Sequence, residues 1–457
     1  MSASHRMTPL ELRASLSLAG VFGLRLLGMF IILPVFGLYA EHLRGGEDHT
    51  LIGLALGAYG LTQAVLQIPF GALSDRWGRK KTIYLGLLIF AAGSFIAAVA
   101  QDIHVVILGR VIQGAGAISA AVMALAADLT RDDQRTKAMA IIGLTIGAAF
   151  TLSMVGGPVL SRWIGVPGIF ALTGALALLA ILVVRFLVPA PATPASAADR
   201  ASQARFVDIM RHPQLLRLNY GIFILSAVLM ALWMVVPFAL RSAGLPGESH
   251  WQIYLPVMVV SVALMVPPML ISERTGRQKA VFLGAIGVLL AAQVLLVGLI
   301  SSLWGLAFAL LVFFTGFNLL EASLPSMVSR TAPSEARGAA VGVYSSVQFL
   351  GSFVGAWAGG AISQHLGAPA VFAFCAFLTL SWLFVAVGMQ ALPGIRTHTY
   401  LVPKMDSAGA EGLSKRLAGV PGVREALVLA GEGVAYLKVD SRRFDESNVL
   451  KLLSGEV

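Results

Sequence analysis

The sequence predicts an all-α membrane protein with twelve transmembrane helices in two six-helix halves, followed by a small α+β domain. Three observations support this fold class. The chain is 57% hydrophobic and 12% charged, with a mean hydropathy of +0.82, whereas soluble domains carry about 25% charged residues. Apolar segments follow one another along most of the chain, and one charged turn occurs in each half. Residues 396–457 have the mixed composition of a soluble domain.

Each apolar segment has about 20 residues or more, which is enough to cross a hydrocarbon core of ~30 Å as a helix. A helix also satisfies its own backbone hydrogen bonds in lipid. Unbroken runs such as LALLAILVV at 176–184 argue against the short alternating strands of a membrane barrel. The predicted segments cover residues 14–40, 50–72, 82–101, 104–127, 137–161, 166–188, 214–240, 250–271, 280–300, 303–328, 338–362 and 368–391.

A tight, strongly charged turn joins the second and third segments and reads GALSDRWGRKK at 71–81. A second turn, SERTGRQK at 272–279, joins the eighth and ninth segments and keeps acid, Arg, Gly and Arg in register. One turn repeated at equivalent places indicates a duplicated membrane unit, which is the usual build of a secondary transporter. The residues of interest are Gly71, Asp75, Arg76, Gly78, Arg79 and Lys80 in the first turn, and Glu273, Arg274, Gly276 and Arg277 in the second.

Lysine and arginine predict the orientation in the membrane. With the N-terminus inside, the predicted inner loops hold most of the basic residues, and the outer loops hold little beyond Arg44, Arg162 and Arg241. This asymmetry places both termini in the cytoplasm. The net charge of +10 does not indicate a nucleic-acid partner, because the basic residues lie in short gaps between apolar runs. The single cysteine, Cys375, excludes a disulfide framework and a cysteine-based metal site.

The boundary between the halves is the segment VPAPATPASAADRASQ at 188–203, which is rich in Ala, Pro and Ser and predicts a flexible linker. The N-terminal half is therefore expected to span residues 1–188, the linker 189–213 and the C-terminal half 214–392. Both halves are predicted to begin on the same side, and so they run in parallel.

The tail at 396–457 predicts the element order β-α-β-β-α, with a hairpin around Gly431 and Gly433 and with Asp445 near the start of the last helix. This order suggests a ferredoxin-like domain. The fold normally ends with a fourth strand, and this strand is either missing or lies beyond the given sequence. We expect a regulatory or stabilising module, for which anion binding through basic residues is one role; a passive tail is the alternative.

These motifs together resemble the major facilitator superfamily. Its signature loop, G-x-L-x-D-R-x-G-R-K, is matched at every specified position by residues 71–80. The stretches LRLLGMFIILPVF, FNLLEASLPS and GVYSSVQFLG, at 24–36, 317–326 and 342–351, resemble its proton-linked drug-efflux branch, and the tail resembles a small domain appended to one member of that branch. The resemblance covers essentially the whole chain. The loop motif identifies the superfamily but says little about the substrate.

The resemblance implies a transporter of the bacterial inner membrane that acts on a small-molecule substrate. Its partners would be that substrate, protons and the lipid membrane; no cofactor or metal is implied, because a proton gradient drives transport. A monomer is favoured.

In the resembling family, the charged loop is thought to stabilise the outward-open state through a charge network. Its glycines let two helices approach and turn tightly. Asp75 can cap a helix start or pair with a cation, and we expect Asp128, at the inner end of the fourth segment, to be an acidic partner of the loop. The alternative is that the charges only anchor the topology. The second turn lacks the initial glycine and is expected to be a weaker gate.

Three charged residues stand out because they lie well inside apolar segments: Arg25, Arg110 and Glu321. Such charges are costly in a bilayer and usually functional. In the resembling fold, helices 1, 4, 7 and 10 line the central cavity, and three of these four carry the charges. We expect Glu321 to carry the proton and Arg110 to tune a site, because burial disfavours an ionised carboxyl and a nearby arginine favours it. The alternative for Glu321 and Arg25 is a static polar pair that holds helices together.

Polar and aromatic residues near these charges are expected to line the substrate cavity. Gln113 lies one turn after Arg110, and Asn318 lies one turn before Glu321, so each pair shares a helix face. For each candidate, ordinary interhelical packing is the alternative. The candidates are Gln113, Asn318, Tyr59, Gln63, Trp233, Tyr344 and Gln348.

Proton-driven efflux of small apolar or amphipathic compounds by alternating access is therefore the predicted function. The fifth segment, LSMVGGPVLSRWIG at 152–165, supports it moderately, because it resembles an antiporter motif with serine at two glycine positions. A proton-coupled importer of a small metabolite and a membrane sensor with a transporter fold remain alternatives. An enzyme is not expected, since the chain has no nucleophile–base pair, phosphate loop or metal cluster, and no catalytic residue is assigned.

Overall fold

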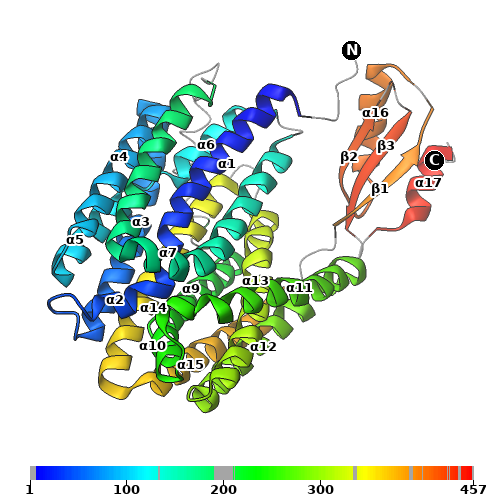
Figure 1. The fold of residues 1–457 in the computed structure, drawn as a ribbon. Coiled ribbons are helices and arrows are strands. Elements are labelled where there is room, and N and C mark those ends of the chain that lie inside the picture. Colours follow the sequence, from blue (N-terminus) through cyan, green and yellow to red (C-terminus); the bar gives the residue numbers. More distant parts are fainter. Residues whose placement is uncertain are drawn as a thin grey trace. The chain divides into compact units, whose positions relative to one another are not determined.

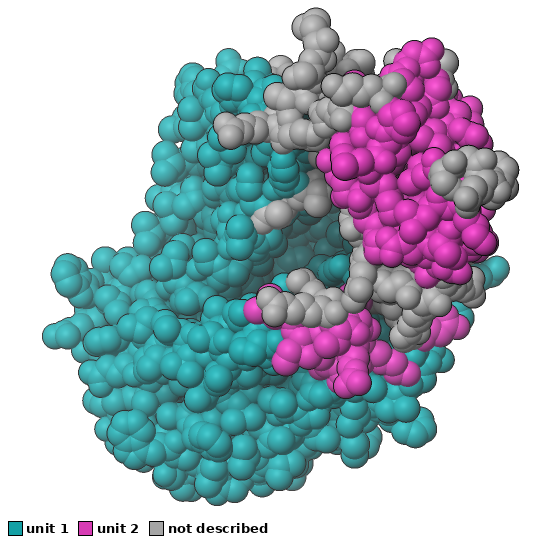
Figure 2. Space-filling model, turned by 90° about the vertical axis from the view of Figure 1, so that its right-hand side faces the viewer, with its two compact units in different colours: residues 1–269, 282–389 teal, residues 270–281, 390–457 magenta. Residues whose placement is uncertain are grey.

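The computed structural model describes residues 7–131, 134–189, 209, 211–332, 337–390, 395–403, 405–429, 431, 433–440 and 444–454. The chain divides into two compact units, coloured separately in Figure 2. Unit 1 comprises residues 1–269 and 282–389, and unit 2 comprises residues 270–281 and 390–457. Figure 1 labels the helices and strands.

Long helices make up the membrane part of the chain. They are α1 (Pro9–Phe30), α2 (Leu33–Ala40), α3 (His49–Trp77), α4 (Arg79–Ala98), α5 (Ile103–Ala115), α6 (Ser119–Asp128), α7 (Arg135–Phe186), α9 (Pro213–Trp233), α10 (Val236–Ser242), α11 (Trp251–Thr275), α12 (Gln278–Leu299), α13 (Leu303–Thr331), α14 (Arg337–Leu366) and α15 (Ala368–Val387), with the 3-10 turn η2 (Gly247–Ser249) before α11. We call α1 to α7 the N half and α9 to α15 the C half.

The described residues contain eleven helical spans that are long and apolar enough to cross a membrane. The fifth span, residues 137–186, is long enough to cross twice, and it is broken at Gly165, where φ is 67°. An L-residue with a side chain rarely adopts this left-handed conformation, so glycine allows the chain to reverse here within one residue. The break divides α7 into two arms, residues 135–164 and 166–186, and the prediction of twelve crossing segments is confirmed.

Side-chain caps begin several of these helices. Thr8 forms a capping box with Glu11 at the start of α1. Asp48 accepts a hydrogen bond from the Thr50 amide at the start of α3, and Asp102 accepts one from the His104 amide at the start of α5. These caps satisfy amide groups that have no partner within the helix itself.

Within unit 1, α3 and α14 bring the two halves together at glycine positions. A Cβ on Gly57 would lie 2.9 Å from the carbonyl oxygen of Phe353, and one on Gly60 would lie 2.7 Å from that of Phe349. A Cβ on Gly53 would overlap the carbonyl oxygen of Ala356. Small residues allow two helix backbones to approach this closely. This contact lies at the helix ends that are far from the charged turn, and we call this end of the helices the opposite end. We call the end that carries the charged turn the gate-loop end.

The C-terminal domain consists of β1 (Ile395–Leu401), α16 (Ser407–Ala418), β2 (Val423–Leu429), β3 (Val434–Asp440) and α17 (Glu446–Ser454). The strands form an antiparallel sheet in the order β1-β3-β2, with Tyr400 opposite Ala435 and Val428 opposite the same residue from the other side. Leu413, Leu437 and Val449 belong to its apolar core. The predicted α+β fold class is confirmed, and β1 is an edge strand among the described strands.

The domain boundaries stay predictions. The predicted linker at 189–213 lies mostly outside the described residues, which resume continuously at 211, and α9 begins at Pro213. Asp445, which was expected near the start of the last helix, accepts a hydrogen bond from the Ser447 amide at 3.0 Å and so caps α17.

Replacing Gly53 with Ala is expected to open the opposite end, because the added methyl group would overlap the backbone of α14. Overpacking of this kind typically costs about 1–3 kcal/mol. Cysteines at His49 and Ser363, whose Nδ1 and Oγ lie 3.3 Å apart, would report the change as weaker crosslinking after the native Cys375 is replaced with Ala. Gly284→Ala is the control, since nothing lies within 4 Å of its Cβ position. Equal crosslinking in both variants would contradict the steric argument.

Candidate functional site

The charged turn at 71–81 joins α3 to α4, and its Arg79 and Lys80 bond to other residues of the N half. Gly78 separates the two helices with a φ of 107°, a conformation that favours glycine. Arg79 donates to Ser74 Oγ at 2.8 Å and to Asp128 Oδ2 at 3.0 Å, and it also pairs with Asp75. The structure therefore brings Arg79 together with the acid that the sequence suggested. Of the two roles predicted for Asp75, the structure shows the ion pair, which Asp75 forms from the last turn of α3.

The other residues of this turn lie differently. Lys80 donates to the backbone carbonyl groups of Val184, at 3.3 Å, and of Val188, near the end of α7. Arg76 is exposed. A Cβ on Gly71 would make ordinary contact with Ala120, at 3.4 Å, so no close approach explains this glycine.

The second turn keeps the backbone feature of the first. Gly276 lies between α11 and α12 with a φ of 66°. The Arg277 amide donates to Thr275 Oγ1 at 3.4 Å, and the Arg277 side chain is exposed. The side chains of Glu273 and Arg274 lie outside the described part of the structure, so their predicted gating role stays a prediction.

Arg25 of α1 is almost fully buried in the N half, at 3% exposure. Its guanidinium donates to Ser119 Oγ at 2.7 Å, Tyr59 Oη at 2.9 Å and Gln63 Oε1 at 2.5 Å. Gln63 in turn donates to Gln67 at 2.8 Å. The partners come from α6 and α3, so this single side chain links three helices. Its Nε has no partner among the described residues.

Arg110 of α5 is 1% exposed. It donates to Gln113 Oε1 at 2.6 Å and to the carbonyl oxygen of Leu56 at 3.3 Å, and its guanidinium lies over the Tyr59 ring, 4.9 Å from the centroid. Gln113 continues the network to Ser94 Oγ at 2.8 Å. The predicted proximity of Arg110 and Gln113 is therefore present in the structure.

Among the described residues, the hydrogen-bond partners of both arginines are neutral groups. Tyr59, Gln63 and Gln113 are each at most 2% exposed, although they were expected to line a substrate cavity. In this conformation they pack inside the N half, so contact with a substrate would require them to move. The expectation that they line the cavity stays a prediction.

In the C half, Glu321 of α13 is partly buried and accepts a hydrogen bond from Gln348 Nε2 of α14 at 3.0 Å. Asn318 faces another helix, because it donates to Ser261 Oγ of α11 at 3.0 Å. Tyr344 is 5% exposed, and its hydroxyl has no partner among the described residues. Trp233 is fully buried. The structure therefore brings together Glu321 and Gln348 but places Trp233 in the packed interior.

Aromatic side chains connect the halves at mid-depth, and the sequence analysis did not identify them. Phe150 of α7 lies edge-on to Phe30 of α1, at 5.1 Å between centroids, and stacks on Phe317 of α13 at 6.0 Å. It also contacts Phe314, which packs against Trp233 at 6.2 Å. Phe314 and Phe317 are three residues apart, as expected for one helix face, but this spacing does not distinguish a contact between halves from ordinary core packing.

An ion pair fastens the halves at the opposite end. Arg241 of α10 donates to both carboxylate oxygens of Glu41, at 2.6 and 2.9 Å. Phe238 stacks on His49 with ring centroids 5.1 Å apart, and the His49 amide donates to Gln364 at 2.8 Å. Glu41 and Arg241 lie near predicted loops, and the sequence alone does not show which residue a charge in a loop will pair with. The sequence analysis therefore missed this contact.

The chain matches the family model described as Major Facilitator Superfamily over residues 18–271 and 258–398, and it belongs to this family. It is a multi-pass membrane transporter and not an enzyme. It is 41% identical over 439 residues to the inner membrane transport protein YajR of Escherichia coli (strain K12), covering 96% of each chain. The predicted resemblance to the drug-antiporter branch, and to YajR in particular, is confirmed.

Two further similarities are more distant. The chain is 26% identical to the quinolone resistance protein NorA of Staphylococcus aureus, over 75% of this chain and 88% of that one. Among solved structures, a D-xylose-proton symporter matches with a TM-score of 0.64 and 15% identity, covering 84% of this chain and 98% of the symporter. At this identity, the symporter supports the fold alone.

The Glu41–Arg241 contact predicts a response to acid. Hydrogen bonds from Arg241 hold the pKa of Glu41 below its ordinary value, so the folded state favours the ionised carboxyl. The stabilisation is complete above the usual glutamate pKa of about 4.3 and is lost as the pH falls through the lowered pKa of the folded state. For a partly exposed pair we expect roughly 1 kcal/mol or less.

Crosslinking between cysteines at His49 and Ser363 should therefore weaken as the pH falls from 6 toward 3, and Glu41→Gln should remove this part of the dependence. His42 also acts on the Glu41 charge, whereas His49 is replaced by cysteine in this reporter protein, so the Glu41→Gln profile separates the carboxyl from the His42 imidazole. Superimposable profiles in the two proteins would contradict the assignment.

The contacts of Arg79 predict a sharp difference from its neighbour Arg76. A lysine at position 79 keeps the charge but loses the planar fork that reaches Ser74, Asp75 and Asp128 together. Arg79→Lys should lower the thermal stability of the purified protein, and Asp128→Asn should do so by about 1 kcal/mol or less, as for exposed pairs. Arg76→Lys is the matched control, since Arg76 is exposed. Equal melting temperatures for the two lysine variants would show that the contacts of Arg79 contribute nothing.

Proposed function

We propose that this transporter exports small apolar or amphipathic compounds in exchange for protons, by alternating access. We place it in a bacterial inner membrane with both termini in the cytoplasm. The positive-inside asymmetry of the loops and the similarity to the inner membrane transport protein YajR and the quinolone resistance protein NorA support these points. Quinolones are accordingly the first cargo to test.

The observation that carries the proposal is the environment of Glu321. Its carboxyl lies partly buried within a membrane helix and accepts a hydrogen bond from the neutral amide of Gln348. A carboxyl without a cationic partner in a medium of low polarity favours its protonated form. Because Gln348 donates to Oε1, the other oxygen, Oε2, is left to hold and release the proton.

The location of Glu321 suggests how proton and cargo would compete. Phe317, one turn away on α13, stacks on Phe150 of the N half, so movement of the halves would change the surroundings of the carboxyl. An amphipathic cargo that enters between the halves would meet these aromatic faces first. Release of the proton would follow when the carboxyl reaches water or approaches a positive charge.

Arg110 and Arg25 would supply that positive charge from the N half. Both are held by neutral acceptors, so these contacts do not cancel their charge. A guanidinium stays protonated in proteins, and its field favours an ionised carboxyl elsewhere in the cavity. We propose that Arg110 tunes the carboxyl in this way, and that Arg25 contributes to the same field.

The test is proton flux in proteoliposomes that contain an internal pH dye. In the wild type, cargo added on one side should trigger proton movement in the opposite direction. Glu321→Gln, which keeps the size of the side chain and can still bond to Gln348, should reduce this coupled flux about a hundredfold or more, the lower end of the usual range for removal of a proton-transfer group. Glu411→Gln is the control, because Glu411 forms an exposed pair with Lys415 in the C-terminal domain.

Unchanged proton flux in a folded Glu321→Gln protein would overturn the assignment of the carrier. Proton movement in the same direction as the cargo would identify an importer instead. If the wild type moves neither protons nor any cargo tested, the antiport proposal fails and the sensor alternative gains weight.

A further inference from the structure

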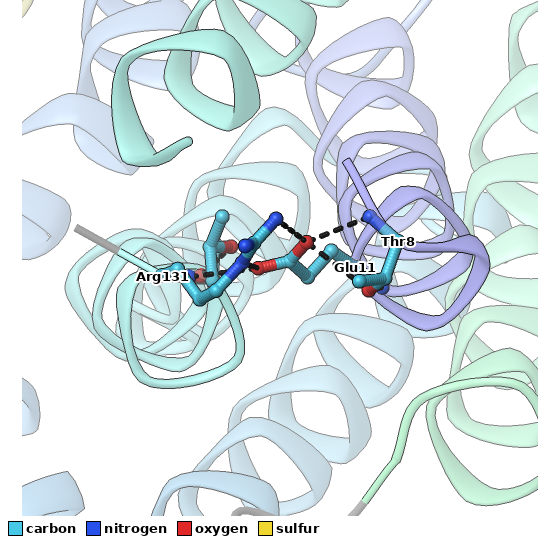
Figure 3. Close-up of polar contacts among 5 residues, drawn as sticks. Thr8, Glu11 and Arg131 are labelled. Atoms are coloured by element: carbon cyan, nitrogen blue, oxygen red, sulfur yellow. Dashed lines mark hydrogen bonds and ion pairs between the residues drawn. The ribbon is translucent and has the colours of Figure 1, made fainter. Parts of the chain in front are cut away.

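The inner start of α1 is fastened to the end of α6 by one carboxylate (Figure 3). Glu11 accepts five hydrogen bonds: the amide and hydroxyl of Thr8 bond to Oε2, and the amide, Nε and Nη2 of Arg131 bond to its two oxygens. The side chain of Glu11 is only 6% exposed, whereas that of Arg131 is 41% exposed. Glu11 is therefore the buried centre of this contact, and Arg131 reaches it from the segment that follows α6.

Arg131 follows shortly after Asp128, which ends α6. Asp128 accepts from Arg79 of the charged turn at 3.0 Å. The short segment from Asp128 to Arg131 is thus held from two directions, by α1 through Glu11 and by α4 through Arg79. Its position decides where the Asp128 carboxylate can meet Arg79.

Two further contacts complete a circuit through the end of α7. Lys80, next to Arg79 on α4, donates to the carbonyl groups of Val184 and Val188. Arg13 of α1 donates to the carbonyl oxygen of Phe186 at 3.2 Å. Basic side chains at a helix C-terminus satisfy carbonyl groups that the helix leaves without partners. The contacts therefore run from α1 to α6, to α4, to α7 and back to α1.

We propose that this inner ring, formed by Glu11–Arg131, Asp128–Arg79, Lys80 with the end of α7, and Arg13 with Phe186, sets the position of the charged turn. Glu11 and Arg131 act in it as positioning residues. The ring lies wholly within the N half, so it moves with that half. The turn can then meet the other half in one defined position when the gate-loop end closes.

The sign of the effect follows from this arrangement. The structure has contacts between the halves at the opposite end, and the ring is intact with that end closed. Loosening the ring does not touch these contacts, but it removes the fixed position of the turn that closure of the gate-loop end needs. A residue shifts an equilibrium only by stabilising one state more than the other. Weakening Glu11–Arg131 should therefore favour the state in which the opposite end is closed.

The test is crosslinking between cysteines at His49 and Ser363 in a Cys375→Ala protein that carries a protease site between its halves. Conditions are chosen at which about half of the parent protein crosslinks. Glu11→Gln keeps an acceptor for Thr8 but weakens the contact with Arg131. We expect it to raise the ratio of crosslinked to uncrosslinked protein by about fivefold or more, the lower end of usual couplings between sites. Arg131→Gln should produce a shift in the same direction.

Thr8→Ala is the matched control, because it removes the cap of the same helix and leaves the Glu11–Arg131 contact in place. An equal shift in Thr8→Ala would reduce the effect to helix stability and overturn the proposal. A lower melting temperature with an unchanged crosslinking ratio in Glu11→Gln would overturn it too. The inference rests on the alternating access of the proposed function but not on proton coupling. Crosslinking needs neither cargo nor gradient, so a failure of the Glu321 experiment leaves this test intact.

Discussion

A charge inside the hydrocarbon region has to find its hydrogen bonds within the protein, and this requirement organises the interior of the N half. Lipid offers no alternative partner, so an unpaired guanidinium there is costly. Arg25 and Arg110 meet the requirement with hydroxyls, amides and carbonyl groups drawn from neighbouring helices. Tyr59 serves both, since its hydroxyl accepts from Arg25 and its ring faces Arg110. The hydrogen bonds that the two buried cations require therefore fix the relative positions of four helices.

The same requirement explains why the contact between the halves looks different. Under the proposed alternating access the halves separate, and strong polar networks between them would resist that movement. The contact between α3 and α14 uses glycines and backbone approach instead, and the mid-depth contact uses phenylalanine rings. The ionic contact between the halves, Glu41 with Arg241, lies at the opposite end, where water can replace either partner when the contact breaks. Within a half the contacts are polar and numerous, and between the halves they are apolar or solvated.

The sequence was sufficient for the fold class because its main determinants are local. Apolar length, the glycines that allow a tight turn at 71–81 and the repeat of the charged turn are all readable along the chain, and so is the order of the C-terminal strands and helices in the sequence. Arg110 with Gln113 was also predictable, because both lie on one helix face. The partners of Arg25 on α3 and α6 were not, since they depend on tertiary packing. Glu11 was overlooked for the same reason: a capping-box glutamate at a helix start carries no sign that Arg131 will join it.

The reversal at Gly165 has a mechanical consequence. A loop of several residues between two helices would absorb small displacements, but the two arms of α7 meet through a single residue. One arm carries Phe150, which touches the C half. Near the end of the other arm, the carbonyl groups of Val184 and Val188 accept hydrogen bonds from Lys80. The two arms therefore connect the mid-depth contact with the C half to the charged turn through one continuous stretch of chain, in which Gly165 is the single break.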